Sequence, residues 1–62
     1  MKDIQFQILQ SIKFFGVIDP SFISLTIQKD IDKVNLSIYN LVASNSIKIS
    51  HKRNGKVYYK LI

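Results

Sequence analysis

Apolar residues near the start of the chain recur at the spacing of one helix face. Ile4, Ile8 and Ile12 lie four residues apart, and mostly polar residues fill the positions between them. A period near 3.6 residues is typical of an amphipathic helix. Gly16 suits the end of this helix, because glycine readily adopts the left-handed conformation that closes many helices. We therefore predict a helix over about residues 3–15.

A second helix is predicted by its start signal rather than by a long apolar stripe. Asp19 precedes Pro20, and an aspartate followed by proline at the first helical position favours a helix start. We expect this helix over about 20–27. The two residues that lead into it, Val17 and Ile18, are expected to be extended.

A third stripe predicts a longer helix over about 31–44. At 100° per residue, apolar residues fall on one side of this helix and polar residues fall on the other. The residues expected to face the core are Ile31, Val34, Ile38, Leu41 and Val42. Those expected on the opposite face are Lys33, Leu36, Ser37, Asn40 and Ser44, with Tyr39 at the border.

The C-terminal segment, 47–62, alternates between apolar and polar residues on both sides of Asn54-Gly55, which predicts a β-hairpin. A two-residue turn on this pair would mix apolar and charged residues on each face. A three-residue loop that also includes Arg53 gathers the apolar residues on one face, so the pattern favours the longer loop. The expected pairs are Ile47 with Leu61, Ile49 with Tyr59, and His51 with Val57.

The order helix, extended segment, helix, helix, strand, strand predicts an α+β fold in one domain, 1–62. A chain of 62 residues, 47% of them hydrophobic, has room for one small core and is not expected to be disordered. It contains no apolar run near the roughly 20 residues that span a membrane and no visible signal peptide. We therefore expect an intracellular protein with no membrane partner.

Charge is unevenly distributed along the chain. The formal net charge is +5, but all four aspartates lie in the first 32 residues. Three lysines accompany them, so this half carries a charge of −1, whereas residues 33–62 carry six cations and no acid. A surface of this kind is expected to face a polyanion.

The sequence offers no constellation for catalysis. Gly16 and Gly55 are the only glycines, so no glycine-rich phosphate loop exists, and there is no cysteine. The only histidine, His51, is interpreted as a packing residue on the inner face of the hairpin. Each aspartate stands where a helix can begin, which suits a capping role. We therefore expect no enzymatic activity, no metal and no cofactor.

Two elements offer contacts to nucleic acid. The hairpin tip carries cations and an amide that can reach phosphates, and such binding weakens steeply with salt. The third helix offers an asparagine that can read adenine and hydroxyls that can reach phosphates or bases. The candidates on the hairpin are Lys52, Arg53, Asn54 and Lys56; those on the helix are Lys33, Ser37 and Asn40, with Asn35 and Tyr39 on its flank.

Three apolar residues fall outside the predicted core stripes: Phe6, Phe14 and Leu25. So small a domain cannot bury every apolar side chain, so single exposed residues need no function. Alternatively, these residues form a contact surface for a partner or for a homodimer, and a two-fold dimer would match a two-fold DNA site.

The spacing of apolar residues through the third helix and the hairpin resembles that of the winged helix-turn-helix superfamily. The resemblance lies in Val34-x3-Ile38-x2-Leu41-x5-Ile47, followed by a strand, Arg53-Asn54-Gly55-Lys56 and a second strand. The resemblance covers essentially the whole chain. It implies that 31–44 is the recognition helix and that the hairpin is the wing. It also implies a small transcriptional regulator that binds double-stranded DNA, with the helix in the major groove and the wing on phosphates.

A narrower resemblance lies within the third helix. The run 34–41 is similar to the recognition helix of Z-alpha domains, which bind left-handed nucleic acid. Asn35 and Tyr39 match the backbone-contacting asparagine and base-contacting tyrosine of that family, and Tyr59 stands where the family has its wing tryptophan. Two positions depart from the pattern: the family's wing prolines are replaced by Lys56-Val57, and Ile31 replaces a lysine.

Three hypotheses therefore remain open from the sequence. The first is a regulator of right-handed DNA, the second is a domain for Z-form nucleic acid, and the third is a winged helix used as a protein-interaction module. Fold alone does not decide among them.

Overall fold

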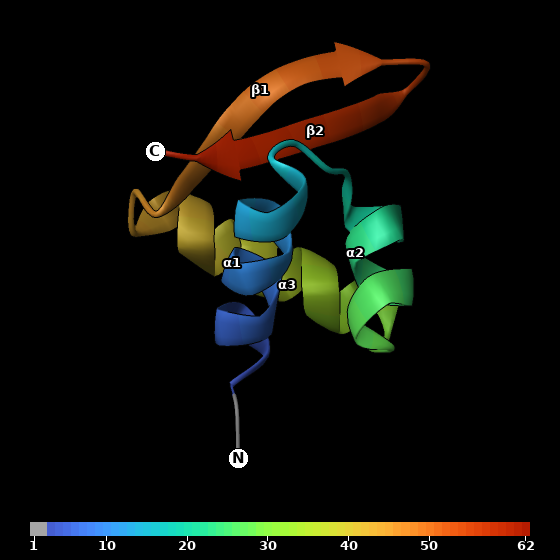
Figure 1. Ribbon diagram of the computed structural model, residues 1–62, viewed down its shortest axis with the longest axis vertical. Helices are drawn as coiled ribbons and strands as arrows, with labels where there is room; N and C mark the ends of the chain where they lie inside the picture. The colour runs from blue at the N-terminus through green and yellow to red at the C-terminus, as the bar shows by residue number, and fades with distance from the viewer. Residues whose placement is uncertain (1–2) are drawn as a thin grey trace.

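The computed structural model describes residues 3–62, so 1–2 of the predicted domain lie outside the described part of the chain. The hairpin lies across one end of a bundle of three helices (Figure 1). This arrangement confirms the predicted α+β fold. The elements are α1 (Ile4–Phe15), α2 (Pro20–Ile27), α3 (Ile31–Ala43), β1 (Ile47–Arg53) and β2 (Lys56–Leu61).

Aspartate side chains fix the starts of two helices. A carboxylate oxygen of Asp3 accepts a hydrogen bond from the backbone N–H of Gln5 at 3.2 Å, and one of Asp30 accepts from Asp32 at 3.1 Å. Asp19 stands at the start of α2 without such a bond. A cap of this kind contributes roughly 0.5–2 kcal/mol, because it satisfies an N–H group that has no partner within the helix.

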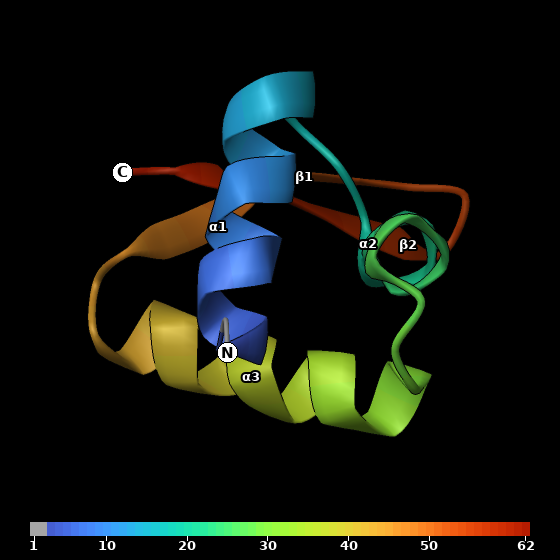
Figure 2. The ribbon, with the colours of Figure 1, turned by 60° about the horizontal axis from the view of Figure 1, so that its bottom comes forward.

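The core is built mainly from isoleucine. Each helix contributes its buried face, and the segment before α2 and the start of β1 each add one side chain. Figure 2 shows how α1 crosses α3, with α2 beside them. The buried hydrophobic residues are Ile8, Ile12, Ile18, Ile23, Val34, Ile38, Leu41 and Ile47.

The buried face of α3 is rotated relative to the prediction. Ser37, expected on the outer face, is only 6% exposed, whereas Ile31 and Val42, expected in the core, are partly exposed. The prediction was wrong because it weighed apolar character alone, while a small side chain such as serine can occupy a crowded inward position. The buried residues follow the helical spacing of three and four: Val34, Ser37, Ile38 and Leu41.

The hairpin confirms two of the three predicted pairs. Ile47 lies opposite Leu61 and Ile49 lies opposite Tyr59, as expected. Beyond these pairs the register shifts, so that His51 lies opposite Tyr58 and not opposite Val57. The predicted three-residue loop is therefore wrong, and the turn consists of the two residues Asn54 and Gly55, with φ of 53° and 77°.

A β-bulge at Ser50 explains both observations. Two positive φ angles give a turn whose twist matches that of the strands, which favours Asn-Gly in a two-residue turn. The bulge takes up the extra residue within β1, so the apolar pairs near the core keep their places. As a consequence His51 is exposed rather than packed on the inner face, and its ring stacks on Tyr58.

The extended segment before α2 joins the sheet at one residue. The N–H of Ile18 donates to the carbonyl oxygen of Tyr59 at 3.2 Å, and the N–H of Tyr59 donates to the carbonyl oxygen of Ile18 at 2.9 Å. This bridge confirms the predicted extended conformation. It also places β2 between β1 on one side and Ile18 on the other.

Candidate nucleic-acid interface

A groove lies between α3 and the hairpin, which we call the wing. It consists of two hollows of about 310 and 330 Å³, and Asn35 and Tyr59 line both of them. We call the two hollows together the α3–wing groove. Its other lining residues are Ile31, Ile38, Tyr39 and Val42 from α3, Ile49, Gly55, Lys56 and Val57 from the wing, and Pro20 and Ser21 from the start of α2.

The helix side of the groove presents Asn35 and Tyr39. They lie four residues apart, so their side chains are neighbours on one flank of α3. Tyr39 is 71% exposed, which leaves its ring open to a ligand. Because Asn35 lines both hollows and Tyr39 lines one, the two side chains present an amide and an aromatic ring to the same groove.

The wing side presents Tyr59 from a fixed main chain. Tyr59 is paired with Ile49 in the hairpin and with Ile18 across the bridge, and its side chain packs against the core. Lys56 is exposed and lines the hollow nearer the wing tip, together with Ile31. The groove therefore combines two tyrosines, one amide and one cation.

The structure separates the remaining helix candidates from this groove. Lys33 and Asn40 are exposed but line neither hollow, and their spacing of seven residues places them together on another flank of α3. Ser37 is buried and is not open to a duplex. The predicted polar face of the helix thus divides into two parts, of which only one meets the wing.

The residues at the wing tip that were predicted to contact phosphates are exposed. Lys52, Arg53 and Asn54 are exposed, and Arg53 lies opposite Lys56 in the register. A cation pair directly across two strands is destabilising by itself. The tip is therefore suited to a negatively charged partner that offsets this repulsion.

Sequence reasoning missed the apolar lining of the groove. Ile31 and Val42 were assigned to the core and Ile49 to the inner face of the hairpin, yet all three are partly exposed and line a hollow. Ile31 and Val42 were detectable as the outermost members of the helix stripe, since residues at the edge of a stripe reach the surface.

The predicted contact residues Phe6, Phe14 and Leu25 are all exposed, Phe14 at 82% and Leu25 at 77%. The Phe14 ring packs edge-on against Phe15, which packs edge-on against Phe22, with ring centroids 4.9 Å apart in each pair. Phe6 lies two turns away on α1, about 12 Å along the axis. The structure confirms that these residues are exposed, and it separates Phe6 from Phe14 along α1.

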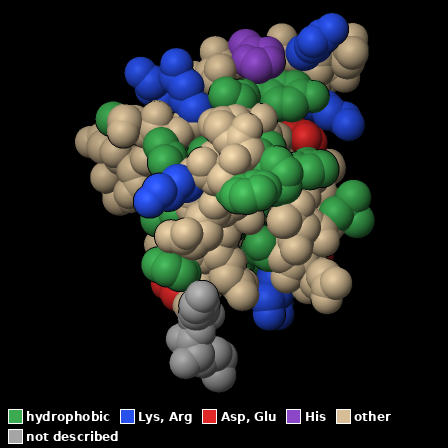
Figure 3. All heavy atoms as spheres, in the orientation of Figure 1, with side chains coloured by type: hydrophobic (Ala, Val, Ile, Leu, Met, Phe, Trp, Pro, Cys, Tyr) green, Lys and Arg blue, Asp and Glu red, His purple; other side chains and the backbone are tan. Residues whose placement is uncertain are grey.

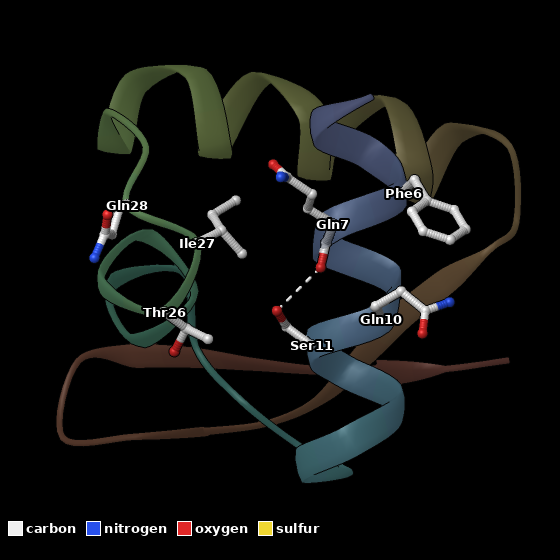
Figure 4. Close-up of a pocket in the computed structure, with 7 residues that line it drawn as sticks. All are labelled: Phe6, Gln7, Gln10, Ser11, Thr26, Ile27 and Gln28. Atoms are coloured by element: carbon white, nitrogen blue, oxygen red, sulfur yellow. Dashed lines mark hydrogen bonds between the residues drawn. The ribbon is translucent and has the colours of Figure 1, made fainter. Parts of the chain in front are cut away.

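A separate cleft lies between α1 and α2 (Figure 4). Its volume is about 400 Å³, and its lining is rich in amide and hydroxyl side chains, with no titratable group among them. The Ser11 hydroxyl donates to the carbonyl oxygen of Gln7 at 3.0 Å. Because this cleft shares no residue with the α3–wing groove, it is not an extension of that groove.

In the part of the chain that the structure describes, no helix is both long enough and apolar enough to cross a membrane.

Comparison with solved structures shows a close match in fold. The chain is similar to the Zalpha domain of PKZ from Carassius auratus, a structure determined in complex with Z-DNA, with a TM-score of 0.86 and 24% identity. The match covers 95% of this chain and 92% of that chain. No protein-family model and no curated protein matches the chain. The likeness confirms the predicted winged-helix fold, with α2 and α3 as the helix-turn-helix and the hairpin as the wing.

Proposed function

We propose that this domain binds a nucleic-acid duplex in its left-handed form through the α3–wing groove. The observation that carries the proposal is the meeting of Asn35, Tyr39 and Tyr59 in one groove, although they lie on two different elements. Asn35 and Tyr39 match the contact residues of Z-alpha domains, and Tyr59 stands where that family has its wing tryptophan. The similarity in fold to a domain that binds Z-DNA supports the same conclusion.

Each groove residue has a chemical role that follows from its side chain. The exposed ring of Tyr39 offers a flat face to a base, and stacking of this kind contributes roughly 1–3 kcal/mol per base. The side-chain NH2 group of Asn35 can donate hydrogen bonds to the phosphate oxygens of the nucleic-acid backbone. Tyr59 supplies the second aromatic wall from a main chain held by Ile49 and Ile18.

Lys56 supplies the cation that the helix lacks. Ile31 stands where Z-alpha domains have a lysine, and Lys56 stands at one of their wing prolines. Lys56 and Ile31 line the same hollow, which also includes Asn35. We infer that the phosphate beside Asn35 is neutralised from the wing rather than from α3.

Circular dichroism of a duplex of alternating dC and dG tests the proposal. Added protein is expected to convert the right-handed spectrum into the left-handed one, because a ligand that binds one form shifts the equilibrium toward it. Tyr39→Ala and Asn35→Ala should each abolish or strongly weaken the conversion. The matched control is Leu36→Ala, an exposed position on α3 that lines neither hollow.

A transcriptional regulator of right-handed DNA is the second candidate, and the exposure of Lys33 and Asn40 on one flank of α3 favours it. In that case Lys33→Ala and Asn40→Ala would weaken binding to right-handed duplex, and the alternating duplex would not change its handedness. If neither duplex binds at low salt, both proposals fail and a protein-interaction module is favoured.

A further inference from the structure

The outer face of the wing carries an arrangement that the α3–wing groove does not use. Ile49 and Tyr59 point toward the groove, so their strand neighbours Lys48, Lys60 and Tyr58 point away from it. His51 lies opposite Tyr58 on this outward side. Figure 3 shows the single histidine on the surface above the bundle, with basic side chains on both sides of it.

His51 and Tyr58 form a flat aromatic stack on this face. Their ring centroids are 4.8 Å apart and the ring planes differ by 8°. The side-chain oxygen of Ser50 lies 3.0 Å from His51 Nδ1, which orients the imidazole. His51 is exposed whereas Tyr58 is half-buried, so the imidazole is the ring of the stack that is more open to a further flat ring.

Cations flank the stack in pairs that are unfavourable for the fold alone. Lys48 lies directly opposite Lys60 on one side of it, and Arg53 lies opposite Lys56 on the other. Like charges in directly opposed positions destabilise a hairpin. A negatively charged ligand that lies along this face would offset the repulsion between Lys48 and Lys60, neither of which lines the α3–wing groove.

Protection of a sheet edge does not account for all of these cations. Lysines on an edge strand discourage pairing with other chains, which explains Lys48 on β1. Lys60 lies on β2, which pairs with β1 on one side and is bridged to Ile18 at the adjacent residue Tyr59 on the other, so the need to protect an open edge is smaller there.

We propose that the outer face of the wing is a second binding site, for single-stranded nucleic acid. One base stacks on His51, and the phosphates beside it lie on Lys48 and Lys60. Aromatic rings combined with cations that follow a backbone are the usual means by which proteins bind single strands without sequence preference. The site differs from the α3–wing groove in its residues and in the form of nucleic acid it takes, so it does not depend on the function proposed above.

Fluorescence anisotropy with a labelled oligo-dT tests this site, because such a strand does not pair with itself into a duplex. The wild-type protein is expected to bind it with an affinity that falls with salt. His51→Ala should lower the affinity roughly fivefold or more, as expected for loss of one stacked base. Lys48→Gln combined with Lys60→Gln should reduce the slope of log affinity against log salt by up to about 1.4.

The matched control removes the same charge elsewhere. Lys13 and Lys29 are exposed and lie outside the wing, so the double variant Lys13→Gln, Lys29→Gln has the same net charge as the wing variant. If this control weakens oligo-dT binding as much as the wing variant does, the effect is one of overall charge and the proposal is wrong. Unchanged binding by His51→Ala would contradict it as well.

A second measurement separates binding from folding. Because Lys48→Gln relieves a cross-strand repulsion, it should raise the melting temperature by roughly 1–8 °C while it weakens oligo-dT binding. A drop in melting temperature together with weaker binding would indicate a structural role and would overturn the proposal.

A third measurement distinguishes this site from the groove. Tyr39→Ala should leave oligo-dT binding unchanged while it removes the handedness conversion of the alternating duplex. Oligo-dT should also remain bound when a left-handed duplex saturates the groove. If the duplex displaces it fully, or if Lys48 and Lys60 variants weaken only duplex binding, no separate single-strand site exists.

Discussion

Ile18 and Tyr59 exchange two backbone hydrogen bonds, 3.2 and 2.9 Å long, and thereby tie the segment between α1 and α2 to the wing. The two residues lie far apart in sequence, and Ile18 is also part of the buried core. Tyr59 is therefore held at the same point by the sheet and by the helical bundle. Its side chain can form a wall of the groove because its main chain has little freedom to move.

The anchored position of Tyr59 leads to a prediction about affinity. Z-alpha domains carry tryptophan at the matching position, and an indole offers a larger aromatic face than a phenol. Tyr59→Trp is expected to raise the affinity for left-handed duplex several-fold, measured by anisotropy with a duplex chemically held in that form. Tyr58→Trp is the matched control, because Tyr58 is adjacent but points away from the groove, and it should leave this affinity unchanged. Equal gains in both variants would contradict the assignment of Tyr59.

The wing tip should dominate the salt dependence of duplex binding. Lys52→Ala, Arg53→Ala and Lys56→Ala together are expected to reduce the slope of log affinity against log salt by up to about 2.7, since each phosphate contact contributes roughly 0.9. The variant with Lys13, Lys29 and Lys33 replaced by alanine loses the same charge away from the wing. Because none of these lysines lines the α3–wing groove, it should keep most of the slope for left-handed duplex. An unchanged slope in the wing variant would show that the tip does not touch phosphates.

Glycine is favoured at position 55 by the backbone conformation and not by a lack of space for a side chain. Its φ is +77°, and a Cβ added there would have no heavy atom within 4 Å. Gly55→Ala should therefore cost about 1 kcal/mol of conformational energy, or roughly 4–8 °C in melting temperature, without any clash. Gly55→Asn should lose less, because asparagine tolerates the left-handed region better. Equal losses for alanine and asparagine would argue against this explanation.

Two positions on α2 should differ sharply in their effect on stability. Ile23 is fully buried, whereas Leu25 is 77% exposed. Ile23→Ala is expected to cost about 2–5 kcal/mol, and Leu25→Ala should change stability by no more than about 0.5 kcal/mol. A domain of this size is stable by only about 3–9 kcal/mol, so the first variant should lose a large fraction of the total stability. Denaturant titration followed by circular dichroism measures both.

The helices could be predicted well because their signals are local. Asp19-Pro20 fixes the start of α2, and Gly16 directly follows the last residue of α1. The rotation of α3 could not be predicted, because it depends on where neighbouring helices lie. Ser37 fits into the core by its small size, and that displaces Val42 toward the groove.

The candidate site was predicted in part, for a related reason. Asn35, Tyr39 and Tyr59 were recognisable one at a time from a family pattern, but their meeting depends on how the wing folds over α3. The register of the wing itself required a choice between turn chemistry and apolar pairing. A bulge at Ser50 satisfies both. The alternating pattern could not predict this bulge, because the pattern assumes that every residue of one strand has a partner on the other.

That bulge has a consequence for how such a wing can change over generations. Without Ser50, every residue of β1 could keep its present partner on β2, from Ile47 opposite Leu61 to Arg53 opposite Lys56. Only the local bend and twist of the strand would be lost. The bulge at Ser50 therefore contributes to the direction in which the tip points, and no other pairing depends on that residue. A descendant of this domain could re-aim its cations toward a differently shaped helix by gaining or losing one residue there.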